Sequence, residues 1–153
     1  MSAWCFSQSM DCVECWEQRE PSFKVRYDKF QSETTIRFTA PVRASEGDGV
    51  LEMSATAFVP DNGGKPSILL SFSQPRQIYN QPTLRLLVNN HPMEFTSKDI
   101  SQYAVFIIPI YDFDRIATGK TVDIQLSTFE GSLTKETLNA FKKLVELTKP
   151  QLR

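Results

Sequence analysis

One stretch decides the fold: Leu51-Glu52-Met53-Ser54-Ala55-Thr56-Ala57-Phe58-Val59. Its side chains alternate between an apolar set and a largely polar set, with Phe58 as the exception. A period of two places alternate side chains on opposite faces of an extended chain, so the stretch predicts a half-buried β-strand. The residues that follow, Pro60-Asp61-Asn62-Gly63-Gly64, indicate a turn because Asn and Gly tolerate a positive φ. Together they predict one arm of an antiparallel hairpin.

The same period recurs on both sides of this hairpin. We expect further strands at Phe23–Asp28, Thr35–Thr39, Ser67–Ser73, Leu84–Val88, His91–Phe95, Tyr103–Ile110 and Thr121–Leu126. The more continuous apolar run at Ser67–Ser73 favours a central strand, and Asn89-Asn90 predicts a short turn between two others. The most hydrophobic run, Tyr103–Ile110, is typical of a buried strand. Its Pro109 cannot donate to a ladder and should lie at an edge or a strand end.

Two segments carry helical signals instead. Thr134–Lys149 places Leu138, Phe141, Leu144, Val145 and Thr148 on one stripe at helical spacing, with Thr134 as the expected N-cap. A short helix is predicted near residues 112–118, with Asp112 as an Asx cap and Gly119 at the stop position.

Strands dominate, and the long helix comes last. Strand–helix–strand alternation does not extend along the chain, which disfavours a doubly wound parallel sheet. We therefore predict a mainly β (α+β) fold: an antiparallel β-sandwich or rolled sheet with one long C-terminal helix covering an edge or open face. Residues 1–22 lack a sustained period and are interpreted as an N-terminal arm, and 23–153 as a single β-rich domain.

Composition narrows the function classes. The 153 residues carry 17 basic and 18 acidic side chains, a net charge of −1 that argues against nucleic-acid binding. The sequence has no apolar run near the ~20 residues of a membrane span. Because the sequence has a single histidine, it argues against most metalloenzyme sites and against most catalytic triads. Without a visible secretory signal the chain is predicted to be cytoplasmic as it stands, or periplasmic or cell-envelope if an export signal has been removed.

The three cysteines, Cys5, Cys12 and Cys15, all lie in the N-terminal arm. Cys12 and Cys15 form a C-x-x-C pair, a spacing that can lower a thiolate pKa for redox exchange. The strand–helix context of thioredoxin-like sites is missing around them. A structural zinc site needs four ligands. Cys5 could be a third ligand beside Cys12 and Cys15, and a dimer partner would have to supply the fourth. The simpler interpretation is incidental thiols, and no cofactor or metal is expected.

Other residues suggest chemistry but have simpler interpretations. His91 follows the Asn89-Asn90 turn and is expected to be solvated rather than a general base. Asp112, Asp114 and Asp123 could pair for acid–base work, but a helix cap and a solvent-facing strand position explain them. The segment Asp61–Lys65 lacks the register of a phosphate-binding loop and is interpreted as a hairpin turn.

The loops at one end of the sheet are the predicted binding surface, especially Gln74–Pro82 and His91–Lys98. Arg76, Tyr79 and Asn80 are the candidate binding residues, because Arg and Tyr are common in interfaces. The alternative is an ordinary exposed loop of mixed polarity.

From Leu84 onward the predicted elements are a hairpin, the buried strand Val105–Ile110 and a short helix. A further strand, the link Glu130-Gly131-Ser132-Leu133 and the closing helix follow. This order resembles the C-terminal halves of small bacterial cell-envelope β-rich proteins of the invasion-associated locus B type. The resemblance implies an exported accessory or binding role. We expect a non-enzymatic accessory or binding protein of a bacterial cell with a protein partner. The alternative is a thiol-based redox protein or enzyme using Cys12 or Cys15. The sequence leaves the oligomeric state open.

Overall fold

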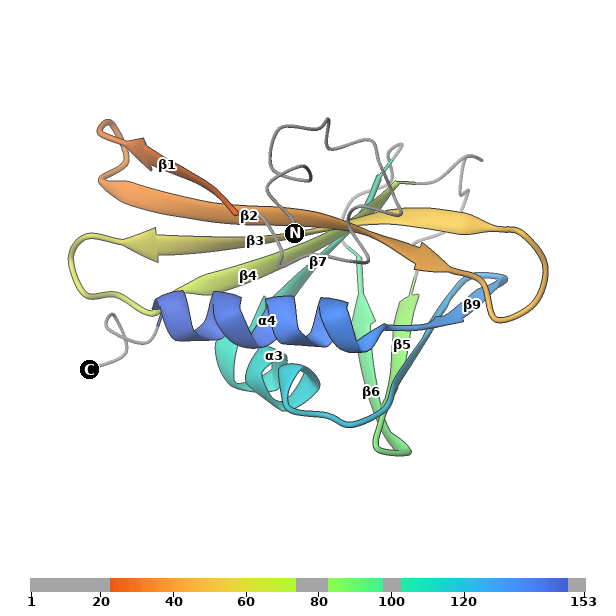
Figure 1. Cartoon of the computed structure of the whole chain (residues 1–153). Helices are drawn as coiled ribbons and strands as arrows, with labels where there is room; N and C mark the ends of the chain where they lie inside the picture. Colours follow the sequence, from red (N-terminus) through yellow and green to blue (C-terminus); the bar gives the residue numbers. More distant parts are fainter. Residues whose placement is uncertain (1–22, 74–82, 98–102, 149–153) are drawn as a thin grey trace, which may run out of the picture.

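The computed structural model describes residues 23–73, 83–97 and 103–148, which form two antiparallel sheets and two helices (Figure 1). The elements are β1 (Lys24–Asp28), β2 (Glu33–Arg43), β3 (Val50–Pro60), β4 (Ser67–Ser73), β5 (Thr83–Val88), β6 (His91–Thr96), β7 (Tyr103–Pro109), α3 (Ile110–Ala117), β8 (Val122–Leu126), β9 (Phe129–Ser132) and α4 (Lys135–Thr148). The mainly β, antiparallel fold with a C-terminal helix is confirmed.

The larger sheet has the strand order β1-β2-β3-β4-β7. The alternating stretch at 51–59 lies within β3, and its small residues Ala55 and Ala57 are fully buried on the inner face. The turn after β3 forms as predicted, with Gly63 at φ +78° and Asn62 Oδ1 accepting a 2.9 Å hydrogen bond from the Gly64 N–H. β4 lies between β3 and β7, so its predicted central position is confirmed.

The smaller sheet has the order β6-β5-β8-β9. Its β5–β6 hairpin closes through Asn89 and Asn90, which both have a positive φ, the conformation of a type I′ turn. Asn89 also ties this turn to the loop before β8. Its Oδ1 accepts hydrogen bonds from the N–H groups of Lys120 at 2.9 Å and Thr121 at 3.3 Å.

The two sheets meet where β9 passes the end of β2. Ala44 forms an isolated bridge with Gly131, and the Ser45 N–H donates a 2.9 Å hydrogen bond to the Glu130 carbonyl. At this point the backbones lie so close that a Cβ at Gly131 would be 2.5 Å from the Arg43 carbonyl oxygen. Glycine is therefore needed here for the close approach.

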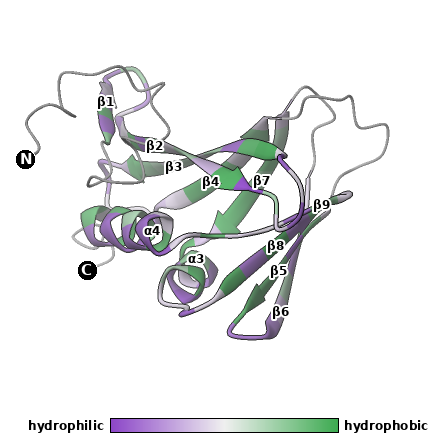
Figure 2. Ribbon diagram, turned by 45° about the vertical axis from the view of Figure 1, so that its right-hand side comes forward, coloured by the Kyte–Doolittle hydropathy of each residue, from purple (hydrophilic) through white to green (hydrophobic). Residues whose placement is uncertain are grey.

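The helices occupy the side on which the two sheets diverge, with α4 below the larger sheet (Figure 2). The predicted stripe of α4 is entirely buried, and the Thr134 hydroxyl accepts a 3.1 Å hydrogen bond from the Thr137 N–H as the N-cap. Phe141 is completely buried between Phe38 and Phe113, with ring centroids at 5.7 and 4.6 Å. This aromatic stack joins both helices to the sheet.

Some local predictions are wrong. Asp112 is not an N-cap: α3 begins at Ile110 directly after Pro109, which has φ −56° and ψ 142°, and the cap makes no side-chain hydrogen bond. Asp112 lies in the first turn instead, where its charge favours the helix dipole. The strand predicted at Tyr103–Ile110 ends at Pro109 and is buried on one face only, with Ile107 61 % exposed. Pro109 does lie at the end of an edge strand.

Two further strands differ from the prediction. β2 continues through Pro41 to Arg43, because β1 pairs only with Glu33–Arg37 and the rest of β2 needs no donors on that side. The four-residue strand β9 was not predicted. Its glycine and its short length hide the two-residue period.

Candidate binding groove

The outer face of the smaller sheet is hollowed into a groove of about 580 Å³. Side chains of β5, β6, β8 and β9 and of the loop after β2 surround it. The volume lies within the range of ~300–1,000 Å³ that is common for ligand sites. The groove is lined by Ser45, Arg85, Leu86, Leu87, Pro92, Met93, Glu94, Asp123, Ile124, Gln125, Glu130 and Gly131.

One row of polar side chains crosses all four strands. The register places Arg85 of β5 opposite Glu94 of β6 on one side and Gln125 of β8 on the other. Gln125 in turn lies opposite Glu130 of β9, and its Nε2 donates a 3.0 Å hydrogen bond to Glu130 Oε1. Arg85 Nε is 3.6 Å from Glu94 Oε2. Both of these charged side chains are largely exposed, so the pair adds little stability and its charges remain accessible to a ligand.

The neighbouring row gives the groove an apolar centre. Leu87 of β5 is 43 % exposed and lies between Pro92 of β6 and Asp123 of β8. The Ser132 hydroxyl of β9 donates a 2.6 Å hydrogen bond to Asp123 Oδ1, which fixes the carboxylate at the edge of this centre. Leu87 and the neighbouring Pro92 form a small exposed apolar area that is bordered by the polar side chains of the groove.

The charge of the groove is negative. Three carboxylates, on Glu94, Asp123 and Glu130, face one guanidinium on Arg85, which leaves a formal charge of −2 at neutral pH. The groove can therefore attract a cationic group through its carboxylates while Leu87 offers an apolar contact. The Arg85 guanidinium can also donate to a backbone carbonyl of a ligand.

A second hollow of about 450 Å³ lies on the outer face of the larger sheet. Its lining is rich in hydroxyls, including those of Ser54, Thr56 and Ser71. The buried Ser54 hydroxyl is already hydrogen-bonded to Arg37 and Thr39, each at 3.2 Å. Because these bonds occupy its most buried polar group, this hollow offers a ligand less than the groove of the smaller sheet.

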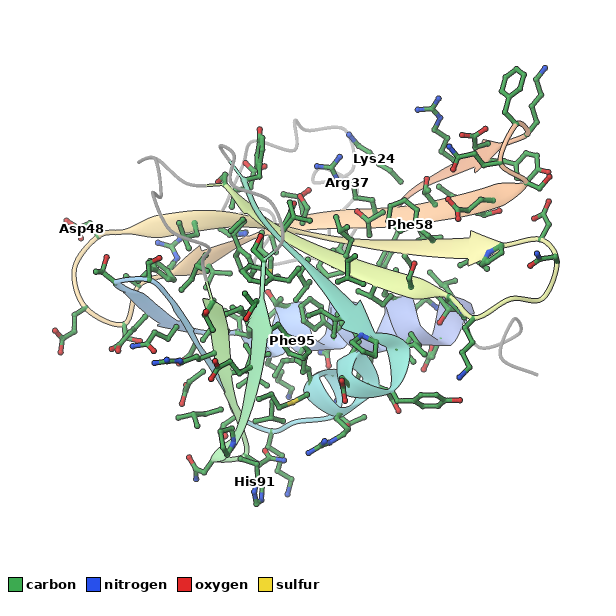
Figure 3. All side chains as sticks on the ribbon, turned by 180° about the vertical axis from the view of Figure 1, so that it is seen from behind. Lys24, Arg37, Asp48, Phe58, His91 and Phe95 are labelled. Carbon is green, nitrogen blue, oxygen red and sulfur yellow. The ribbon has the colours of Figure 1, made fainter. Side chains whose placement is uncertain are left out.

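The carboxylates considered for acid–base chemistry do not come together. Asp112 and Asp114 lie on α3, whereas Asp123 lies on the outer face of β8, as predicted for a solvent-facing position. His91 begins β6 and projects from the tip of the β5–β6 hairpin, exposed as predicted (Figure 3). Within residues 23–73, 83–97 and 103–148, no group of three or more His, Cys, Asp or Glu could hold a metal ion.

The turn at Asp61–Lys65 has a structural role. Tyr27 of β1 donates a 2.7 Å hydrogen bond to Asp61 Oδ2. This hydrogen bond to a carboxylate, together with the negative charge of Asp61, raises the pKa of Tyr27 above its usual 10.0. Lys65 lies over the ring of Tyr111, with its Nζ 5.6 Å from the centroid.

Several predicted residues lie outside the described part of the chain. They are the loop residues Arg76, Tyr79 and Asn80 and the cysteines Cys5, Cys12 and Cys15. Residues His91–Thr96 form the edge strand β6, which confirms the strand predicted at His91–Phe95. The description of His91–Lys98 as a binding loop is therefore wrong over these residues.

The groove residues themselves were missed, although part of the signal was present. A two-residue turn at Asn89-Asn90 sets Arg85 opposite Glu94 by simple counting, and these are opposite charges. The long-range pairing of β5 with β8 has no such local signal.

The chain matches no known family model, curated protein or solved structure in comparisons with each. None of the helices among the described residues has the length and apolar character needed to cross a bilayer.

Proposed function

We propose that the protein is a non-enzymatic binding module that holds an extended segment of a partner protein in the groove of its smaller sheet. The observation that carries the proposal is the arrangement around Leu87: an exposed apolar centre flanked by a polar row from four strands. An extended segment places alternate side chains on one side, at a spacing that matches neighbouring rows of a sheet.

The chemistry of the groove specifies the segment. Its apolar side chain would cover Leu87, and a flanking Lys or Arg would pair with Asp123 or Glu130. The Arg85 guanidinium would donate to a backbone carbonyl or to a single carboxylate of the segment. This partner class fits the accessory role in a bacterial cell that the resemblance to invasion-associated locus B proteins implies, and that role is part of the proposal.

Selection from a random heptapeptide library against the full chain tests the proposal. We expect enrichment of peptides with one large apolar residue flanked by Lys or Arg. Replacing Leu87 by Ser should weaken binding of such a peptide about 5-fold, because about 1 kcal/mol of apolar burial is lost. Val50→Ser is the matched control, because Val50 is similarly exposed at 48 % and does not line the groove.

A second variant tests the contribution of the groove's negative charge to peptide binding. Asp123→Asn keeps an acceptor for the Ser132 hydroxyl but removes one charge, so binding should weaken and lose part of its salt dependence. Enrichment of acidic peptides, or equal effects of Leu87→Ser and Val50→Ser, would contradict the proposal.

A further experiment distinguishes the binding proposal from the alternative function, thiol redox chemistry at Cys12 and Cys15. On the binding proposal, replacing both cysteines by Ser leaves folding and peptide affinity unchanged. Loss of either would favour the redox alternative.

A further inference from the structure

Four strands form the outer edges of the two sheets, and three of them carry features that discourage pairing with another chain. β6 contains Pro92, which has no N–H to donate. β7 ends at Pro109 and packs near β6. β9 has four residues and is bridged to Ala44. Within the described residues, β1 is the one edge that lacks all of these protections.

β1 is also exposed on both faces. Val25 is 65 % and Tyr27 55 % exposed, and Phe30 at the adjoining turn is 89 % exposed. The hairpin of β1 and β2 lies at one end of the molecule, remote from the β5–β6 hairpin and its groove (Figure 1). A strand with accessible backbone groups and apolar side chains is a template for adding another strand.

The sequence of β1, Lys24-Val25-Arg26-Tyr27-Asp28, is complementary to itself when two copies run antiparallel. With Arg26 on the two-fold axis, Lys24 of each copy lies opposite Asp28 of the other, and Val25 lies opposite Tyr27. Opposite charges and pairs of an aromatic with a β-branched residue are favourable when directly opposed across strands. The one unfavourable pair is Arg26 with its own copy.

We propose that two copies of this chain associate through β1, in antiparallel register about Arg26, to form one continuous ten-stranded sheet. The isologous geometry is that of a two-fold dimer, in which one patch meets itself. The contact is a short strand, so its area is below that of a permanent interface and the dimer should dissociate on dilution.

Sedimentation equilibrium of the full chain between about 1 μM and about 1 mM tests this, since these concentrations span weak association. We expect a monomer–dimer equilibrium. β1 already pairs with β2 in the monomer, so only its amides that face away from β2 report the dimer. Hydrogen exchange at the two extremes should show these outward-facing amides of β1 protected only at the high concentration.

Lys24→Glu separates the dimer contact from the stability of the monomer. Within the chain Lys24 lies opposite Arg37, and both are on the same face of the sheet (Figure 3). The substitution therefore replaces a like-charge pair by an opposite one inside the monomer and should not destabilise its hairpin. In the dimer it sets Glu opposite Asp28 twice, so the dissociation constant should rise at least about 10-fold. Lys120→Glu, with the same charge change in an exposed loop, is the control.

The register is tested at Arg26, which lies opposite the uncharged Thr35 within the chain. Arg26→Thr removes the one repulsive pair and should strengthen the dimer. A mixture of wild type with Arg26→Glu should form the mixed dimer in preference to either homodimer, as native mass spectrometry can count. A monomer at all concentrations would overturn the proposal. So would protection, already at the lowest concentration, of the β1 amides that face away from β2, or a dimer whose stability does not change when Lys24 or Arg26 is replaced.

Discussion

Replacing Gly131 by Ala tests how the two sheets are joined. The added Cβ would lie 2.5 Å from the Arg43 carbonyl oxygen and 3.1 Å from Phe129 Cε1. The first contact is to backbone, so it is relieved only if β9 moves away from the end of β2. That movement breaks or weakens the hydrogen bond from the Ser45 N–H to the Glu130 carbonyl, now 2.9 Å long.

The magnitude follows from these contacts. Overpacking costs about 1–3 kcal/mol, and the lost hydrogen bond about 0.5–1.5 kcal/mol. Alanine reduces the entropy of the unfolded chain, which offsets about 0.4–1 kcal/mol. We expect a net loss of about 1–3 kcal/mol in the free energy of unfolding. For a chain of this size that lowers Tm by roughly 2–12 °C.

The assay is urea unfolding followed by circular dichroism, with Gly49→Ala as the matched control. Gly49 lies at the same corner, but its Cβ would make only ordinary contacts, at 3.5 Å from Ala44 and 3.9 Å from Phe129. Gly49→Ala should leave stability unchanged within about 0.5 kcal/mol or raise it slightly. Equal stabilities of the two variants would refute the close approach of β9 and β2.

Three further predictions concern the core and the turns. Phe141→Ala should lower the free energy of unfolding by about 3–5 kcal/mol, because it leaves a cavity at a buried aromatic site. In the same urea experiment Leu147→Ala, on the exposed side of the same helix, should lower it by less than about 1 kcal/mol. Asn89→Ala should lower the free energy of unfolding more than Asn89→Gly does. Both variants lose the acceptor for the loop before β8, but only glycine keeps an unstrained positive φ. Equal losses of stability would contradict the turn geometry. The folded-state pKa of Tyr27 is raised, so its bond to Asp61 stabilises the hairpin below about pH 10 and this contribution is lost as pH rises through the raised value. Tyr27→Phe should remove a component that titrates above pH 10 from the tyrosinate absorbance curve, and an unchanged curve would contradict the assignment.

Local periodicity was sufficient for most of the secondary structure. The alternation at 51–59 and the stripe of α4 both hold because each buries one face of an element, and burial is what the pattern encodes. The prediction of an Asp112 cap failed because the chain passes from β7 into α3 through Pro109, whose fixed φ lets the helix begin two residues earlier. β9 is defined by its partners rather than by its own sequence.

The candidate groove could be predicted only in part, for a related reason. Its Arg85–Glu94 pair follows from the Asn89-Asn90 turn, which fixes the register of one hairpin. Its other half depends on β8 lying beside β5, a contact between segments far apart in the sequence. Side chains such as Leu87 and Asp123 gain a shared surface from that pairing, and no local pattern marks it.

The most direct test of the binding account is a map of where a selected peptide contacts the protein. Amide shifts of the ¹⁵N-labelled full chain, followed during titration with a library-selected cationic–apolar peptide, provide it. The account predicts that the largest changes fall on β5 and β8 around Arg85, Leu87 and Asp123. Changes concentrated on the hydroxyl-lined face around Ser54 and Ser71, with β5 and β8 unaffected, would contradict it.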